Sequence, residues 1–284
     1  ATHFKIAPMV IGLTIVSIGT SAPELLVSIQ AALSGSPDIA IGNVIGSNIA
    51  NLALVLGVTA LILPIPVARN TIRIDWPVMM VATLVFWWMM MDGVLSFFDG
   101  MVLFLSLVAY IIYLLVQSKR NPFISDSDVV DDVGKRGGLW IELLKVVLGC
   151  IGLVFGADLL VSGASDLARG FGVSEHVIGV TVVAFGTSVP ELATSMVAAI
   201  KKELDISVGN LIGSNIFNIL SILGITSMVK PIPINDVVLA SDIFWVLGVT
   251  LLILPLAVHR FRIHRWKGAL LLGIYLTYIL VVIS

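Results

Sequence analysis

The chain has 284 residues, of which 58% are hydrophobic and only 12% are charged, with a formal net charge of −2. A soluble domain carries about 25% charged residues, and a disordered chain has low hydrophobicity, so the composition excludes both classes. The charge balance shows no excess of basic residues, so the sequence does not indicate a nucleic-acid-binding protein. The single cysteine, Cys150, excludes an internal disulfide and a cysteine metal cage. A mean hydropathy of +1.08 indicates a polytopic membrane protein.

Long apolar stretches recur along the chain, and several are interrupted by glycine or proline. A membrane helix needs about 20 mostly apolar residues, so each stretch is a candidate span. The predicted fold class is therefore an all-α polytopic membrane protein that lies in the lipid bilayer. The predicted spans lie near 8–34, 38–63, 74–91, 100–116, 139–162, 173–200, 205–229, 241–258 and 266–283.

One long polar stretch, residues 117–138, separates the fourth and fifth of these spans and reads as a solvated linker. With nine alternating spans, fourteen of the sixteen Lys and Arg residues fall on the same face as this linker. Only Arg169 and Lys230 fall on the other face. Positive residues accumulate on the cytoplasmic side of membrane proteins, so the linker is predicted to be cytoplasmic.

The sequence matches itself at a constant offset, without gaps. Residues 11–28 align with 178–195, and 38–51 align with 205–218; over positions 11–67, 29 of 57 residues are identical. Five spans separate the two copies, and because five is odd the second copy enters the membrane from the opposite face. Such inverted repeats are common in secondary transporters, with a binding site near the midplane.

The repeat also predicts the domain organisation. The first half is expected over 1–116 (spans 2–5 of the full repeat) and the second over 139–284 (spans 6–10), joined by the linker 117–138. Residues 1–12 align with 168–179, so residue 1 matches the exit of the span 139–162. We therefore expect a tenth helix, first in order, upstream of residue 1.

Glu24 and Glu191 occupy matching positions within two predicted spans. A carboxylate at mid-membrane costs about 2.5–3.5 kcal/mol on insertion scales, and such groups usually have a function. An inverted repeat can bring both to one point near its axis. The alternative is a protonated glutamic acid in a structural hydrogen bond.

Each glutamate belongs to a motif, GTSAPE at 19–24 and GTSVPE at 186–191. Thr20 and Thr187 lie four residues before the glutamates and share a helix face with them, and Ser21 and Ser188 add hydroxyls. The proline in each motif breaks the helix, which frees backbone oxygens in the preceding turn. A packing kink is the simpler alternative.

A second motif reads GNVIGSNIAN at 42–51 and GNLIGSNIFN at 209–218. Ser47 with Asn51, and Ser214 with Asn218, are four residues apart and face one side of each helix. Glycines spaced by four permit close helix contact. Asn48 and Asn215 point elsewhere and are predicted to form hydrogen bonds between helices.

The candidate ligands are carboxylates, hydroxyls, amides and freed carbonyls, which is the oxygen set of a hard cation. Ca²⁺ takes about 6–8 oxygen ligands, whereas transition metals favour His or Cys. Two carboxylates balance one Ca²⁺, and the same oxygens could hold Na⁺. The four histidines, all near span ends, are predicted to lie at the surface.

With these paired motifs the chain resembles the cation/calcium exchanger superfamily, and most closely its sodium/calcium exchanger branch. The resemblance implies a ten-helix inverted repeat that exchanges Ca²⁺ for Na⁺ by alternating access, without a cofactor. It also implies the ion ligands, by matching position: Thr20, Ser21, Glu24, Ser47, Asn51, Thr187, Ser188, Glu191, Ser214 and Asn218, with backbone oxygens of Ser17 and Ala184.

The chain departs from the family at one point, because relatives often carry an acid in one repeat where it has Asn51 and Asn218. Exchange of Ca²⁺ for H⁺, or a K⁺-dependent exchange, therefore stays open, and a cation channel is a further alternative. The sequence has no phosphate-binding loop of the type G-x-x-x-x-G-K-[ST]. It also has no H-E-x-x-H motif or nucleophile elbow, so neither a nucleotide-driven pump nor an enzyme is expected.

Overall fold

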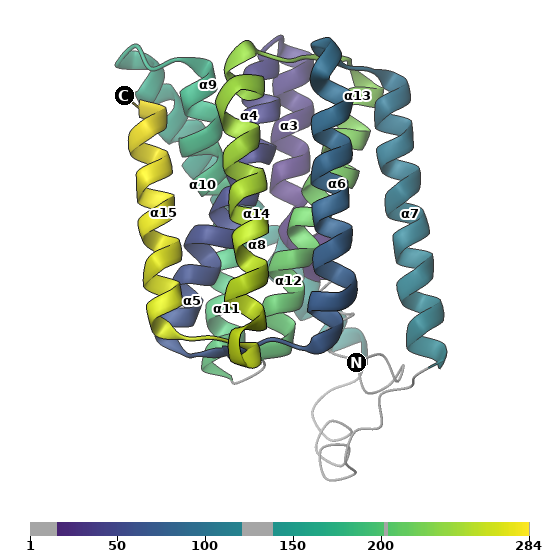
Figure 1. Ribbon diagram of the computed structural model, residues 1–284. Coiled ribbons are helices and arrows are strands. Elements are labelled where there is room, and N and C mark those ends of the chain that lie inside the picture. The colour runs from purple at the N-terminus through teal and green to yellow at the C-terminus, as the bar shows by residue number, and fades with distance from the viewer. Residues whose placement is uncertain (1–15, 121–138, 202–203, 284) are drawn as a thin grey trace.

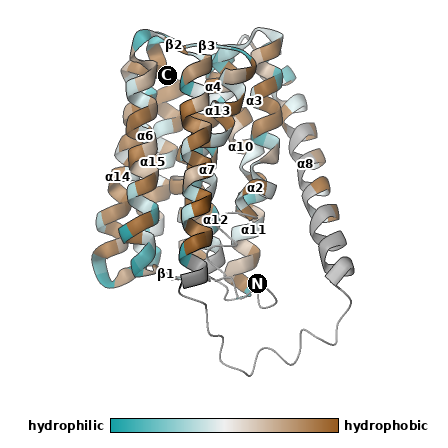
Figure 2. Ribbon diagram, turned by 90° about the vertical axis from the view of Figure 1, so that its right-hand side faces the viewer, coloured by the Kyte–Doolittle hydropathy of each residue, from teal (hydrophilic) through white to brown (hydrophobic). Residues whose placement is uncertain are grey.

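Long apolar helices, packed side by side, make up most of the chain in the computed structural model, which describes residues 16–120, 139–201 and 204–283 (Figure 1). Apolar residues predominate along the middle of the helices, and polar residues are concentrated at both ends of the bundle (Figure 2). Within the described residues, these stretches are long and apolar enough to cross a membrane: Pro37–Ile62, Thr71–Asp92, Phe97–Gln117, Glu175–Ile200, Ser207–Val229, Val238–Phe261 and Arg265–Ile283. The protein is therefore an integral, multi-pass membrane protein.

The first half runs from α2 to α7. Its elements are α2 (Ser17–Thr20), α3 (Ala22–Ser34), α4 (Pro37–Ile49), the π-helix η3 (Ala50–Val55), α5 (Leu56–Ile62), β1 (Ile65–Pro66), the π-helix η4 (Thr71–Asp75), α6 (Trp76–Met89), the 3₁₀-helix η5 (Met90–Asp92), β2 (Val94–Leu95) and α7 (Phe97–Arg120).

The second half begins with α8 (Leu139–Gly170), which extends beyond the predicted span 139–162. It continues with α9 (Glu175–Ile178), the π-helix η7 (Gly179–Val183), α10 (Ala184–Thr187), α11 (Val189–Ile200), α12 (Leu204–Phe217), the π-helix η8 (Asn218–Leu223), α13 (Gly224–Val229), β3 (Ile232–Pro233), the π-helix η9 (Val238–Asp242), α14 (Ile243–Val258), the 3₁₀-helix η10 (His259–Phe261), β4 (Arg262–Ile263) and α15 (Arg265–Ile283).

The two halves repeat the same order of elements. Most helices of one half begin at the position that the sequence repeat aligns with the start of a helix in the other half. These pairs are α2 and α10, α3 and α11, α4 and α12, α6 and α14, and the π-helices η4 and η9. The gapless alignment in the sequence is therefore also a gapless alignment of structure.

Two short strand pairs show how the halves are related. β1 of the first half pairs antiparallel with β4 of the second, and β3 of the second half pairs with β2 of the first. The β2–β3 pair lies at one end of the bundle and β1 at the other (Figure 2). The equivalent strands β1 and β3 thus lie on opposite membrane faces, as the inverted topology requires.

The turns before β2 and β4 share an unusual backbone conformation. Gly93 (φ +84°) directly precedes β2, and the pair Arg260 (φ +62°) and Phe261 (φ +51°) directly precedes β4; all three adopt the left-handed region. Glycine enters this region freely, whereas other L-residues are strained there. The turn in the first half is thus made without strain and that in the second with strain, where the Lys267 ammonium donates hydrogen bonds to the carbonyl oxygens of Leu256, His259 and Arg262.

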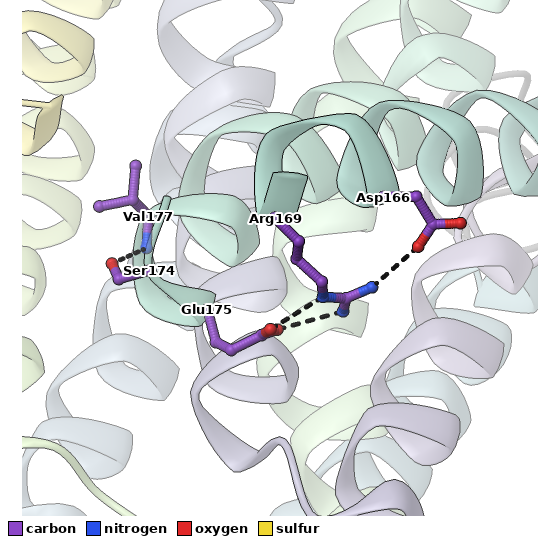
Figure 3. Close-up of polar contacts among 5 residues, drawn as sticks. All are labelled: Asp166, Arg169, Ser174, Glu175 and Val177. Carbon is purple, nitrogen blue, oxygen red and sulfur yellow. Dashed lines mark hydrogen bonds and ion pairs between the residues drawn. The ribbon is translucent and has the colours of Figure 1, made fainter. Parts of the chain in front are cut away.

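The connection between α8 and α9 is held by a small polar cluster (Figure 3). The Arg169 guanidinium binds both carboxylate oxygens of Glu175, Nε to Oε1 at 2.8 Å and Nη2 to Oε2 at 3.1 Å, and contacts Asp166 at 3.2 Å. The Ser174 hydroxyl accepts the backbone N–H of Val177 and caps the start of α9. These contacts lie at the entry of the span that carries Glu191, and because the side chains are partly exposed they contribute little to stability.

Candidate cation site

Both predicted helix breaks are present. α2 ends at Thr20, Ser21 leaves helical geometry (φ −87°, ψ 8°), and α3 starts at Ala22 with Pro23 in its first turn. In the second half Ser188 (φ −81°, ψ 0°) also separates two helices, α10 and α11, although its backbone stays in the right-handed helical region, and Pro190 lies in the first turn of α11. Each break places the hydroxyls of its motif at the junction of two short helices.

Glu24 and Glu191 lie in the first turns of α3 and α11, and neither is exposed. The N-terminal end of a helix carries partial positive charge, which favours a carboxylate there. Glu191 Oε1 accepts hydrogen bonds from the hydroxyls of Ser21 at 3.2 Å and Ser214 at 3.3 Å. Because Ser21 precedes Glu24 by three residues, this contact joins the two motifs directly.

The second motif lies on α4 and α12, in the most deeply buried of the described spans. Ser47 Oγ lies 3.2 Å from Thr187 Oγ1 and 3.4 Å from the carbonyl oxygen of Ala184, so α4 contacts the break of the opposite half. The close approach depends on glycine. A Cβ built on Gly46 would lie 2.5 Å from both the Val180 carbonyl oxygen and the Ala184 Cβ.

Asn51 and Asn218 lie where the helices change type. Asn51 falls within η3, and Asn218 begins η8. A π-helical turn inserts an extra residue and is frequent at functional sites. The Asn51 amide donates to Asn215 Oδ1 at 3.3 Å, and the Asn215 amide in turn donates to the carbonyl oxygen of Asn48 at 3.4 Å. The predicted interhelical bonding of Asn215 is confirmed, and these contacts bridge the two halves.

The two backbone oxygens that the resemblance implied are already engaged within the protein. The carbonyl oxygen of Ser17 accepts the N–H of Ser21 at 2.9 Å, and that of Ala184 accepts the N–H of Ser188 at 3.1 Å. The hydroxyls of Ser47 and Thr20 also lie 3.4 Å from the Ala184 and Ser17 carbonyls, respectively. A cation contact at either carbonyl would therefore replace one of these weak hydroxyl contacts.

Two further asparagines, which were not predicted as ligands, also lie at this junction. Asn43 and Asn210 are buried, and their side-chain oxygens accept hydrogen bonds from Thr187 at 3.0 Å and Thr20 at 3.2 Å, respectively. Both asparagines sit in the GN pair of the second motif, at equivalent positions of the two repeats. In the sequence, the one sign that these asparagines have a role is that they recur at equivalent positions of the two repeats.

The prediction of surface histidines is wrong for His176. Its imidazole is largely covered and lies 3.0 Å from the carboxylate of the buried Asp242. The two residues are on different spans, so their contact depends on tertiary packing that spacing along the chain does not reveal.

Several buried polar atoms at this junction have no hydrogen-bond partner. A buried polar group without a partner costs about 1–3 kcal/mol, and a charged one costs more, so a compensating ligand is expected. Of the candidate ligands within the described residues, these atoms lack a partner: both carboxylate oxygens of Glu24, Oε2 of Glu191, the hydroxyl of Ser188, Oδ1 of Asn51, and Oδ1 and Nδ2 of Asn218.

Nearly all these atoms are oxygens, and three of them belong to the two carboxylates of Glu24 and Glu191, so the donors fit a hard cation. In the described part of the chain, no cluster of three or more His, Cys, Asp or Glu residues could hold a metal. The candidate ligands at this junction are two carboxylates and neutral oxygens. The inverted repeat and this buried acid pair are typical of a secondary transporter for cations.

Comparisons with known proteins agree with this class. The family model described as "Sodium/calcium exchanger protein" matches residues 1–119 and 141–284. The chain belongs to this family, which makes it a cation exchanger and a transporter rather than an enzyme.

Similar proteins include the "Putative antiporter CaxA" of Alkalimonas amylolytica, 37% identical over 98% of this chain and 89% of that protein. The "Sodium/calcium exchanger MaX1" of Methanosarcina acetivorans is 32% identical over 99% of this chain and 90% of that protein. A solved structure of the sodium-calcium exchanger NCX_Mj superposes with a TM-score of 0.78, at 37% identity, over 98% of this chain and 89% of that one.

Proposed function

We propose that the protein exchanges Ca²⁺ for Na⁺ across the membrane by alternating access to the buried site. The ligands are Thr20, Ser21, Glu24, Ser47, Asn51, Thr187, Ser188, Glu191, Ser214 and Asn218, with the carbonyl oxygens of Ser17 and Ala184 as further contacts. The observation that carries the proposal is the pair of fully buried carboxylates, Glu24 and Glu191, whose oxygens are largely unpartnered.

Charge balance supports the choice of ions. Two ionised carboxylates carry a charge of −2, which one Ca²⁺ or two Na⁺ would neutralise, and the neutral oxygens suit both ions. Competition for the same oxygens would then couple the two fluxes. The names of MaX1 and NCX_Mj, both called sodium/calcium exchangers, agree with this pair of ions.

The inverted repeat supports the mechanism. Two halves of similar sequence and opposite orientation can exchange conformations, which would open the site to one face and then to the other. The excess of Lys and Arg on the face of residues 117–138 supports a cytoplasmic location for this linker between the halves 1–116 and 139–284.

The test is transport by purified protein in vesicles. We expect an outward Na⁺ gradient to drive uptake of radioactive Ca²⁺ that saturates with Ca²⁺ concentration. Outward H⁺ and K⁺ gradients, applied separately, test the alternative coupling ions. Uptake driven only by H⁺, or only when K⁺ is present, would overturn the Na⁺ assignment, and Ca²⁺ flux that needs no counter-ion would indicate a channel.

Substitutions test the site itself. Glu24→Gln and Glu191→Gln keep the side-chain size but remove the charge, and each should abolish Ca²⁺ uptake. Glu175→Gln is the matched control, because Glu175 lies on the same span as Glu191 but is partly exposed and pairs with Arg169. Near-normal uptake by either site variant would refute the ligand assignment.

A further inference from the structure

Asn43 and Asn210 occupy equivalent positions in the two repeats and have no place among the proposed ligands. Each lies four residues before the serine of its motif, and each is at most 1% exposed. A buried amide has to satisfy an acceptor and two donors, so its partners show what it holds in place.

Each amide oxygen accepts a hydrogen bond across the repeat interface, and Asn43 Oδ1 also lies 3.5 Å from the Ser47 hydroxyl of its own helix. Thr187 of the second repeat donates to Asn43 Oδ1 at 3.0 Å, and Thr20 of the first repeat donates to Asn210 Oδ1 at 3.2 Å. Each threonine hydroxyl also lies near a carbonyl oxygen of its own helix, Val183 at 3.0 Å and Val16 at 3.1 Å. A hydroxyl has one hydrogen and two lone pairs, so when its hydrogen goes to either acceptor both lone pairs stay available for a cation.

The amide group of Asn43 extends this contact to the glutamate. Its Nδ2 donates to the carbonyl oxygen of Glu24 at 3.1 Å and to Ser28 Oγ at 2.9 Å. Because a backbone carbonyl can only accept, this contact fixes the amide orientation and leaves Oδ1 facing Thr187. One side chain thus joins the backbone of Glu24 to the threonine of the other repeat.

The second repeat makes only part of this arrangement. Ser17 Oγ donates to the backbone oxygen of Asn210 at 3.1 Å. Within the described residues, Asn210 Nδ2 and the hydroxyl of Ser195, the counterpart of Ser28, have no hydrogen-bond partner. The side chain of Asn43 therefore forms hydrogen bonds through both its oxygen and its nitrogen, whereas that of Asn210 does so only through its oxygen, which accepts from Thr20.

We propose that Asn43 and Asn210 are positioning residues for cation exchange, each holding the ligand threonine of the opposite repeat. The inference rests on the proposed function, because it concerns how two of the proposed ligands are oriented. Neither asparagine is assigned a contact with the ion; each acts through Thr187 or Thr20.

Double-mutant cycles test this crossed pattern. Asn43→Ala and Asn210→Ala are combined with Thr187→Val and Thr20→Val, and the Ca²⁺ concentration for half-maximal uptake is measured in vesicles. Each asparagine variant should raise this concentration about three- to tenfold, the range that one buried hydrogen bond contributes. The crossed pairs 43/187 and 210/20 should be non-additive by a similar factor, whereas the same-repeat pairs 43/20 and 210/187 should be additive.

A second readout covers variants with no measurable uptake. For these variants, the coupling between each asparagine and each threonine is obtained from the Ca²⁺-induced rise in the unfolding temperature of the purified protein. Asn48→Ala is the matched control, because Asn48 is a buried asparagine on the same helix whose side chain has no contact with either threonine among those described. It should leave the Ca²⁺ dependence near that of the wild type even if it lowers the unfolding temperature.

Equal coupling in crossed and same-repeat pairs would overturn the inference, as would equal effects of Asn43→Ala and Asn48→Ala on Ca²⁺ dependence. Loss of uptake in Glu24→Gln and Glu191→Gln alongside such a result would leave the proposed function standing. If both glutamine variants still transport Ca²⁺, the proposed function itself fails, whatever the cycles give.

Discussion

Ser21 of the first repeat donates a hydrogen bond to the Glu191 carboxylate of the second, at 3.2 Å, with both side chains buried. A hydrogen bond to a charged group contributes about 1.5–3 kcal/mol. Ser21→Ala removes this donor and one proposed ligand oxygen, so Ca²⁺ affinity should fall at least about tenfold. The measurement is the Ca²⁺ dependence of uptake in vesicles.

The control for this prediction is Ser227→Ala. Ser227 is also buried, but its hydroxyl donates to carbonyl oxygens of its own helix region, Leu223 and Gly224. Its replacement should leave the Ca²⁺ dependence unchanged. If Ser21→Ala behaves like this control, the contact with Glu191 does not contribute to binding.

Asn51 and Asn218, the matching asparagines of the two repeats, should differ from each other when replaced. Asn218 has no hydrogen-bond partner for either side-chain atom in the described part of the chain, whereas the Asn51 amide donates to Asn215. Both Asn218→Ala and Asn51→Ala should weaken Ca²⁺ uptake less than loss of a glutamate, since each removes a neutral donor. Only Asn51→Ala should also lower the unfolding temperature of the ion-free protein, because it breaks a bond between the halves.

Gly46 should not tolerate a side chain. A methyl group there would lie 2.5 Å from the carbonyl oxygen of Val180 and from the Ala184 Cβ, and overpacking of this kind costs about 1–3 kcal/mol. Gly46→Ala should therefore lower the unfolding temperature and, by moving Ser47 away from Thr187, reduce Ca²⁺ uptake. Gly248→Ala, in α14 with nothing within 4 Å of its Cβ, should be neutral or stabilising; equal behaviour of the two variants would contradict the packing argument.

The left-handed turns offer a pair of opposite stability predictions. Arg260→Gly relieves a strained backbone of φ +62° in the turn before β4, and Gly93→Ala introduces strain at φ +84° in the turn before β2. Left-handed geometry costs a non-glycine residue about 1–2 kcal/mol, so the first variant should raise the unfolding temperature and the second should lower it. A shift in the same direction for both would show that local backbone strain does not govern these turns.

The paired motifs made the architecture predictable from sequence. An odd number of spans between two copies is sufficient to require opposite orientation, and Pro23 and Pro190 mark the helix breaks because their backbone lacks the N–H donor. Glu24 and Glu191 stood out because a buried carboxylate within a membrane span is costly.

The finer features of the site were not predictable because they depend on contacts between distant segments. The crossed bonds of Asn43 and Asn210 join residues 144 and 190 positions apart. The π-helical turn at Asn51 has no local sequence signal comparable to proline, since it arises where packing favours an extra residue. The contact of His176 with Asp242 likewise needs two spans to meet.

The crossed strand pairs have a consequence for how the chain is assembled. β1 cannot complete its pairing until β4 has been synthesised, and β2 cannot do so until β3 is present. Neither half contains both strands of either pair. Two separately produced halves should therefore form the native strand pairs only when they associate. Cutting the polypeptide between the halves after insertion should, for the same reason, leave the two pieces associated.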